Sequence, residues 1–169
     1  MPKVLSFNKF CKKYELGKQT MSNFQILDAV KKIKRKNFRD VYISDKFPKK
    51  VHKNECGIYN LQDSDEPGSH WCAYYKKLDE RYAFDSYGLE PCDELIAYLK
   101  TPLEWKNNEP VVTCSTFQIQ QFGKHYCGEL CLYILKMLDI GFDFRSTLLR
   151  LKDEQSLQTK SDKVWRETR

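Results

Sequence analysis

The chain has 169 residues, of which 41% are apolar and 14% aromatic, and it carries a net charge of +6. This length suits one domain with a single core, so we expect one domain over residues 1–169, with its core at about 22–152 and a polar, frayed tail at 153–169. The apolar stretches are far shorter than the roughly 20 residues of a membrane helix, and lysines interrupt the apolar residues of the N-terminus. We therefore expect a soluble, intracellular monomer without membrane contact.

The charge is distributed unevenly along the chain. Residues 1–53 hold 15 Lys and Arg against 4 Asp and Glu, a net charge of +11, whereas the other 116 residues carry −5. Clustered lysines such as those of "KKIKRKNFR" form either a solvated helix face or a contact for an acidic partner. DNA is the acidic partner that we consider, as an accessory contact.

The seven cysteines show no pattern of a small disulfide-rich scaffold. Their number is odd, no CxxC pair occurs, and the N-terminal residues do not resemble a secretory signal, which predicts free thiols in a reducing compartment. Most of them are expected to be small buried hydrophobic residues.

The first predicted element is an amphipathic helix at residues 22–36. Apolar residues recur there at helical spacing, at Phe24, Leu27, Val30 and Ile33. Short runs of alternating or aromatic residues, separated by polar turns, then predict four strands. These strands lie at residues 39–45, 56–61, 70–77 and 81–86. The turn "LDE" joins the last two, which predicts an antiparallel hairpin in the core.

The second half of the chain adds three helices and one strand. A helix at residues 92–100 is followed by a buried strand at 111–119, and a helix at 142–152 completes the fold. Between these, "CGELCLYILKML" predicts a helix from Cys127 to about Leu138. This helix is apolar almost all round and is therefore expected at the centre of the domain. The order predicts an α+β domain with a central sheet and one buried helix.

A Cys-Gly pair opens this central helix, in the stretch "QQFGKHYCGELC". Free backbone N–H groups and the positive end of the helix dipole favour the thiolate of Cys127. The same N–H groups can donate to an oxyanion on a scissile carbonyl, and Gly128 leaves room for a substrate backbone. The pattern fits either a nucleophile or a buried thiol that caps the helix.

A cysteine nucleophile needs a base, and the chain offers three histidines. His125 lies two residues before the helix and points away from its N-terminus, whereas His52 lies among lysines and has no carboxylate on a paired strand. His70 opens one strand of the predicted hairpin, and Asp85 lies near the end of the other. A carboxylate at that position orients the imidazole and stabilises its protonated form.

Three glutamines precede the cysteine, at Gln118, Gln120 and Gln121. A glutamine amide can donate to an oxyanion without carrying a charge that competes with a thiolate–imidazolium pair. Each glutamine can equally be a solvated side chain at the end of a strand.

Together, the motifs "GSHW", "YAFDSYG" and "QIQQFGKHYCGELCLYIL" resemble the superfamily of adenain and the ubiquitin-like proteases. The resemblance covers residues 22–140 and is strongest to the adenain-like proteases of Maverick/Polinton-type elements and related double-stranded DNA viruses. It implies a papain-like cysteine protease fold, in which helices flank a central mixed sheet and the nucleophile begins a buried helix. Asp85 follows the SUMO-protease pattern, because adenain has a glutamate there.

The resemblance implies a role for each candidate catalytic residue. His70 is the general base, Asp85 orients it, and Cys127 is the nucleophile. The oxyanion donor is Gln120 by the spacing in adenain and Gln121 by the spacing in SUMO proteases.

The resemblance also bears on substrates and partners. It implies an endopeptidase that cuts capsid or core precursor proteins at Gly-Gly-X or Gly-X-Gly sites without a cofactor for the chemistry; removal of ubiquitin-like modifiers is the alternative. Adenain is activated by a peptide, through a disulfide, and by DNA. Cys114 is the analogue for that disulfide, and residues 1–53 are the candidate DNA contact. Trp71 either walls the site in the SUMO-protease manner or packs in the core.

Two other classes of function remain open. A zinc site would use Cys127, Cys131 and His125, but a second ligand pair at similar spacing is missing from the sequence, so we expect no metal. The second class is a protease fold that has lost activity and binds DNA or a capsid protein. The retention of all four candidate catalytic residues argues against it.

Overall fold

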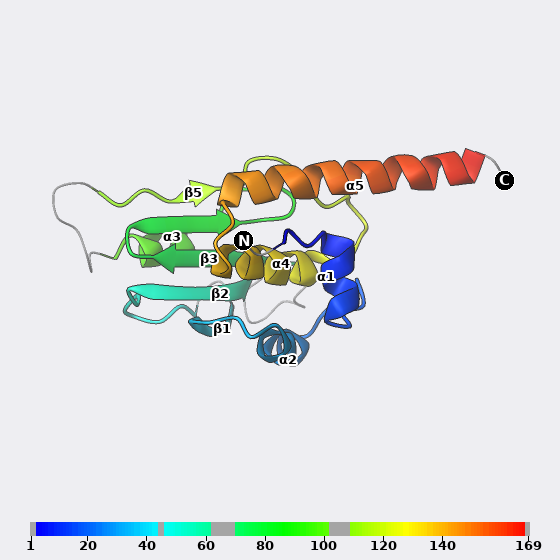
Figure 1. Cartoon of the computed structure of the whole chain (residues 1–169). Helices are drawn as coiled ribbons and strands as arrows, with labels where there is room; N and C mark the ends of the chain where they lie inside the picture. Colours follow the sequence, from blue (N-terminus) through cyan, green and yellow to red (C-terminus); the bar gives the residue numbers. More distant parts are fainter. Residues whose placement is uncertain (1–2, 44–45, 62–69, 102–108, 168–169) are drawn as a thin grey trace.

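The computed structural model describes residues 3–43, 46–61, 70–101 and 109–167, with side chains described to residue 157. Figure 1 shows a central sheet flanked by helices. Its five strands lie in the order of the chain and are β1 Phe38–Ile43, β2 Asn54–Asn60, β3 Trp71–Lys77, β4 Glu80–Phe84 and β5 Thr113–Cys114. The outer pairs β1–β2 and β4–β5 are parallel, whereas β2–β3 and β3–β4 are antiparallel. This confirms the predicted α+β fold with a central mixed sheet.

The described helices are α1 Phe7–Lys13, α2 Asn23–Ile33, α3 Asp93–Leu99, α4 Cys127–Asp139 and α5 Phe144–Glu167. Helix α4 lies on β3 and contacts α1, α2 and α5. Eleven of its 13 residues are buried, which confirms the prediction of one buried helix at the centre. None of the described helices combines the length and the apolar composition that a membrane crossing requires.

Apolar side chains cover both faces of the sheet. Along β3, Trp71, Ala73 and Tyr75 pack in the core that contains α4, whereas Cys72 and Tyr74 pack in a second core that contains α3. Successive side chains of a strand point to opposite faces, so a strand buried on both faces shows no polar alternation. The run "WCAYY" has this composition because β3 is the middle strand.

Strands β3 and β4 form the predicted antiparallel hairpin. Ala73 pairs with Phe84, so the next residues along the two strands, Cys72 and Asp85, lie opposite each other. His70 precedes β3 and therefore lies at the same end of the hairpin as Asp85. The register alone brings a histidine, a thiol and a carboxylate together.

The strand predicted at residues 111–119 is wrong in its length, because only the two residues of β5 pair with β4. Beyond β5 the chain leaves the ladder and is held by the segment that follows β4. The N–H groups of Ile119 and Gln120 both donate to the carbonyl of Ser86, at 2.8 and 2.9 Å. An irregular loop, rather than a strand, therefore carries the glutamines toward α4. Residues 44–45 of the first predicted strand lie outside the described residues.

The sequence pattern does not predict α1, and the structure places this helix in the core. Phe7 and Phe10 are fully buried, with ring centroids 5.8 and 5.3 Å from that of Tyr133 on α4. The core therefore begins before the boundary expected at residue 22.

The sequence predicts a frayed tail from residue 153. In the structure, helix α5 instead continues to Glu167. The carboxylate of Glu154 accepts hydrogen bonds from the N–H groups of Phe7 and Asn8, at 2.9 and 3.0 Å. The first N–H groups of a helix have no partner within it, so this carboxylate caps α1. This contact between Phe7 and Glu154, 147 positions apart, thus orders both the start of α1 and the part of α5 around Glu154.

Candidate active site

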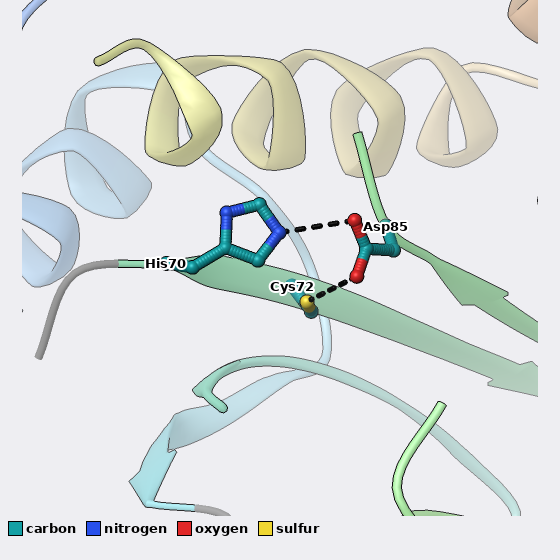
Figure 2. Close-up of side chains that lie close together, drawn as sticks. All are labelled: His70, Cys72 and Asp85. Atoms are coloured by element: carbon teal, nitrogen blue, oxygen red, sulfur yellow. Dashed lines mark hydrogen bonds and ion pairs between the residues drawn. The ribbon is translucent and has the colours of Figure 1, made fainter. Parts of the chain in front are cut away.

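His70 and Asp85 face each other at one end of the hairpin, as predicted. The Nε2 atom of His70 lies 3.0 Å from Oδ1 of Asp85, and Figure 2 shows the two side chains pointing toward one another. The two side chains are 12% and 4% exposed, so solvent screens their interaction only weakly. The pair has the geometry that holds an imidazole in one orientation.

Cys127 is the first residue of α4 and approaches His70 from the core that contains this helix. Its sulfur accepts a hydrogen bond from the backbone N–H of Trp71, at 3.4 Å, and the residue is 5% exposed. Burial lowers the pKa of His70, but hydrogen bonds to Asp85 and Cys127 outweigh this effect and raise that pKa to about 9. His70 is therefore protonated at neutral pH and presents a positive charge to the sulfur atom.

Asp85 is fixed by hydrogen bonds from several directions. Its Oδ1 atom also accepts the N–H of Tyr87 at 2.7 Å, and its Oδ2 atom accepts the thiol of Cys72 at 3.5 Å (Figure 2). Its backbone N–H donates to the Ser115 hydroxyl, at 2.9 Å. These hydrogen bonds hold the carboxylate in one position beside the imidazolium.

Gln120 is buried beside this segment. Its Oε1 atom accepts the hydroxyl of Ser86 at 2.7 Å, and its Nε2 atom donates to the carbonyl of Lys124 at 2.6 Å. Because Ser86 directly follows Asp85, these bonds tie the glutamine loop to the hairpin end that carries the carboxylate. Gln118 donates to the carbonyl of Gln120, at 2.8 Å, and supports the same loop.

Met21 lies against both Trp71 and Gly128. The indole N–H of Trp71 donates to the carbonyl of Met21 at 2.9 Å, and the side chain packs in the core. A β-carbon on Gly128 would lie 3.2 Å from the sulfur of Met21. Met21 therefore occupies the space beside Gly128 that was expected for a substrate backbone, because the chain before α2 folds over the start of α4.

Tyr87 is a site residue that the sequence reasoning missed. Its ring stacks on the imidazole of His70, with centroids 4.6 Å apart and planes at 17°. The exposed ring of Phe122 stacks in turn on the ring of Tyr87, with ring centroids 5.0 Å apart. The aromatic residue in "DSYG" was a signal, since a strand-end carboxylate followed by an aromatic ring can hold an imidazole from two sides.

Cys72 is the second thiol near the imidazole, and His70, Cys72 and Asp85 have ligand atoms within 4.8 Å of one another. Cys72 is completely buried; burial and the charge of Asp85 raise the pKa of its thiol well above the ordinary value. A thiol must ionise to attack a carbonyl. Cys72 therefore fits a hydrogen-bonded support for Asp85 and His70 better than a nucleophile.

Cys114 and His125 lie elsewhere. Cys114 is on β5, opposite Ala83, with its thiol free and 3.8 Å from the carbonyl of Val112. His125 is exposed in the loop before α4. The structure brings His70, Asp85 and Cys127 together and leaves these two residues outside that cluster.

The fold is shared with a protease. Two crystal structures of the ASFV pS273R protease, one of them with selenomethionine, match this chain with TM-scores of 0.58 and 0.53 and sequence identities of 18% and 16%. Each match covers 82% of this chain and 65% of the other, so the chain spans about two-thirds of the protease chains it matches. No family model and no curated protein matches the sequence.

Proposed function

We propose that the protein is a cysteine endopeptidase with Cys127 as nucleophile, His70 as general base and Asp85 as the residue that orients the base. The observation that carries the proposal is the hydrogen-bonded series from Asp85 through His70 to Cys127, at the start of a buried helix. The fold shared with the ASFV pS273R protease supports it. The nucleophile, base and orienting group are the three parts that thiol catalysis needs.

The chemistry proceeds by acyl transfer. The sulfur of Cys127 attacks the scissile carbonyl carbon, and the electron pair of the C=O bond moves to oxygen. The backbone N–H of Cys127 and one N–H of the Gln120 amide donate to this oxyanion; Gln121 is the alternative donor. When the C–N bond breaks, His70 protonates the leaving amine, and a thioester remains on Cys127. His70 then takes a proton from water, which attacks the thioester and releases Cys127 as thiolate.

The substrate we propose is a protein cut at a Gly-Gly-X or Gly-X-Gly site, as in viral capsid or core precursors. Processing of ubiquitin-like modifiers uses the same catalytic residues. Comparing a Gly-Gly-X peptide with a ubiquitin-like fusion of the same sequence at the cleavage point separates the two. An activating peptide bound through Cys114 remains part of the proposal.

Thiol labelling tests the proposed nucleophile. With a thiol-reactive probe at pH 7, we expect one thiol to react much faster than the other six, and Cys127→Ala and His70→Ala to abolish this fast phase. Cys92→Ala is the matched control, because Cys92 is more exposed than Cys127 and its loss should leave the fast phase intact. A fast phase that survives in Cys127→Ala, or is absent from the parent in the presence and absence of DNA, contradicts the proposal.

A further inference from the structure

Glu129 is a buried acid for which the proposed chemistry has no use. It lies in the first turn of α4, two residues after Cys127, and is 1% exposed. Its Oε1 atom accepts the backbone N–H of Gln19 at 3.2 Å, whereas its Oε2 atom is buried without a hydrogen-bond partner. A buried carboxylate oxygen without a partner in the protein is costly, so the Oε2 atom can accept a hydrogen bond from a bound group.

The carboxyl group lines a cavity of about 250 Å³ between α2, α4 and the segment that joins α1 to α2. Three acids line this cavity, Glu15, Asp28 and Glu129, against one cation, Lys32. The first two are half of the four acids in residues 1–53, where 15 basic residues give the opposite charge. Acids are thus gathered around one cavity in the most basic part of the chain.

The cavity also has an apolar side, formed by Leu16, Met21 and Ala29. A metal ion would need ligand atoms closer together than these acids provide: within the described part of the chain, the cluster His70, Cys72 and Asp85 is the one that meets the distance for a shared ion. A cation on a hydrocarbon stem matches both sides, since the stem can pack on the apolar residues while its charged end meets the carboxylates.

We propose that this cavity binds a lysine or arginine side chain of a polypeptide, with the carboxylate of Glu129 as the partner of its charge. Lysine and arginine side chains of a polypeptide carry an ammonium or guanidinium group on such a stem. The occupant would lie close to the proposed active site. Met21 lines the cavity, its carbonyl holds the indole of Trp71, and its sulfur covers Gly128.

Binding should depend on pH. Burial raises the pKa of the Glu129 carboxyl to about 7, although its own backbone N–H and that of Gln19 act to lower it. The carboxyl is therefore ionised above pH 7 and protonated below, and a cation binds the ionised form. Affinity should be level above pH 7 and fall as pH drops from 7 to the lower pKa of Glu129 in the complex, by about tenfold in all if binding lowers that pKa by one unit. Glu15, Asp28 and Lys32 line the cavity with Glu129, and the buried thiols of Cys11 and Cys131 also interact with its charge.

The test follows the Glu129 carboxyl signal by NMR in full-length protein labelled with ¹³C-glutamate. The probe is Nα-acetyl-arginine amide, and its neutral analogue Nα-acetyl-citrulline amide is the control ligand. We expect the arginine compound to shift this signal, to lower the pKa of Glu129 by about one unit or more, and to bind as the pH dependence above requires. The citrulline compound should do none of these.

Two variants locate the site, and isothermal titration calorimetry with the same two compounds measures their affinities. Glu129→Gln keeps an acceptor for the N–H of Gln19 and should weaken binding about tenfold or more. Asp28→Asn, at an exposed position that does not threaten folding, should weaken it about two- to fivefold. Asp93→Asn, an exposed acid in the first turn of α3, is the matched control and should bind like the parent. Equal binding of arginine and citrulline compounds, unchanged affinity in both cavity variants, or no arginine-dependent shift of Glu129 would overturn the proposal.

Discussion

At the scale of single residues, the site depends on one ion pair. His70 has a pKa of about 9, because its hydrogen bonds to Asp85 and Cys127 outweigh the effect of burial. A group whose pKa is raised on folding stabilises the folded state fully below its ordinary pKa of 6.5, and that contribution is lost as pH rises through 9. Activity should also fall as pH rises through 9, because the imidazolium that protonates the leaving amine is lost there.

Asp85→Asn tests this dependence. Without the carboxylate charge, the pKa of His70 should fall, so the alkaline limb of the pH–rate profile should move to lower pH. We expect kcat/KM for a Gly-Gly-X peptide to drop by about 100-fold or more, since general base catalysis contributes about that much. Asp79→Asn, an exposed acid in the turn of the same hairpin, should leave both quantities unchanged. An alkaline limb that stays near pH 9 in Asp85→Asn would count against the assignment of Asp85.

Tyr87 supports the imidazole from its face rather than its edge. Tyr87→Leu should lower kcat/KM by about two- to tenfold, because a stacked ring pair is worth about 0.5–1.5 kcal/mol. Tyr87→Phe keeps the ring and should retain activity. Steady-state peptide hydrolysis measures both variants, and equal activity of Tyr87→Leu and the parent would show that the stack at 4.6 Å does not position His70.

At the scale of elements, the sequence predicts those that have a strong local pattern. Helix α4 is apolar almost all round, and the hairpin β3–β4 has aromatic strands joined by a short polar turn, so both could be predicted. Helix α1 could not, because it has only seven residues, three of them lysines, and little helical periodicity. The limits of β5 and α5 also depend on distant partners, the carbonyl of Ser86 and the backbone of α1.

Glu154→Ala tests how far α1 depends on its cap. The substitution leaves the N–H groups of Phe7 and Asn8 without their acceptor, so we expect the free energy of unfolding to fall by about 1–2 kcal/mol. Urea denaturation followed by circular dichroism measures the change. The control is Asp153→Ala, at the neighbouring exposed residue, which should unfold at the same urea concentration as the parent. Equal stability of the two variants would mean that α1 does not need this cap.

At the scale of the whole molecule, the sequence predicts the fold class and the contact between His70 and Asp85, because hairpin register is a local property. It does not predict that Met21 covers Gly128 or that Gln19 donates to Glu129, contacts between residues about 110 positions apart. These contacts arise only when α2 packs against α4. The surroundings of Trp71 and Gly128 could not be predicted from the sequence for this reason.

The uneven charge of the chain is also a property of the whole molecule. We expect double-stranded DNA to bind through the basic residues of 1–53, with affinity that falls steeply as salt is added. Lys31, Lys34 and Lys36 are exposed at the end of α2, and their joint replacement by Gln should reduce the slope of log K against log salt by about 3. Fluorescence anisotropy with a DNA duplex measures this slope. Replacing Lys77, Lys124 and Lys152 instead should change it little; equal slopes in the two triple variants would exclude the proposed contact.

The bond between Glu154 and the start of α1 has a consequence for biosynthesis. A ribosome releases the N-terminal residues first, but α1 lacks its cap until the residues of α5 have also emerged. The same delay applies to the segment that covers α4, since Glu129 is made 110 residues after Gln19. These contacts of the early part of the chain therefore form only after the late part has emerged. Cys127 likewise can contact His70 only after the first turn of α4 has emerged.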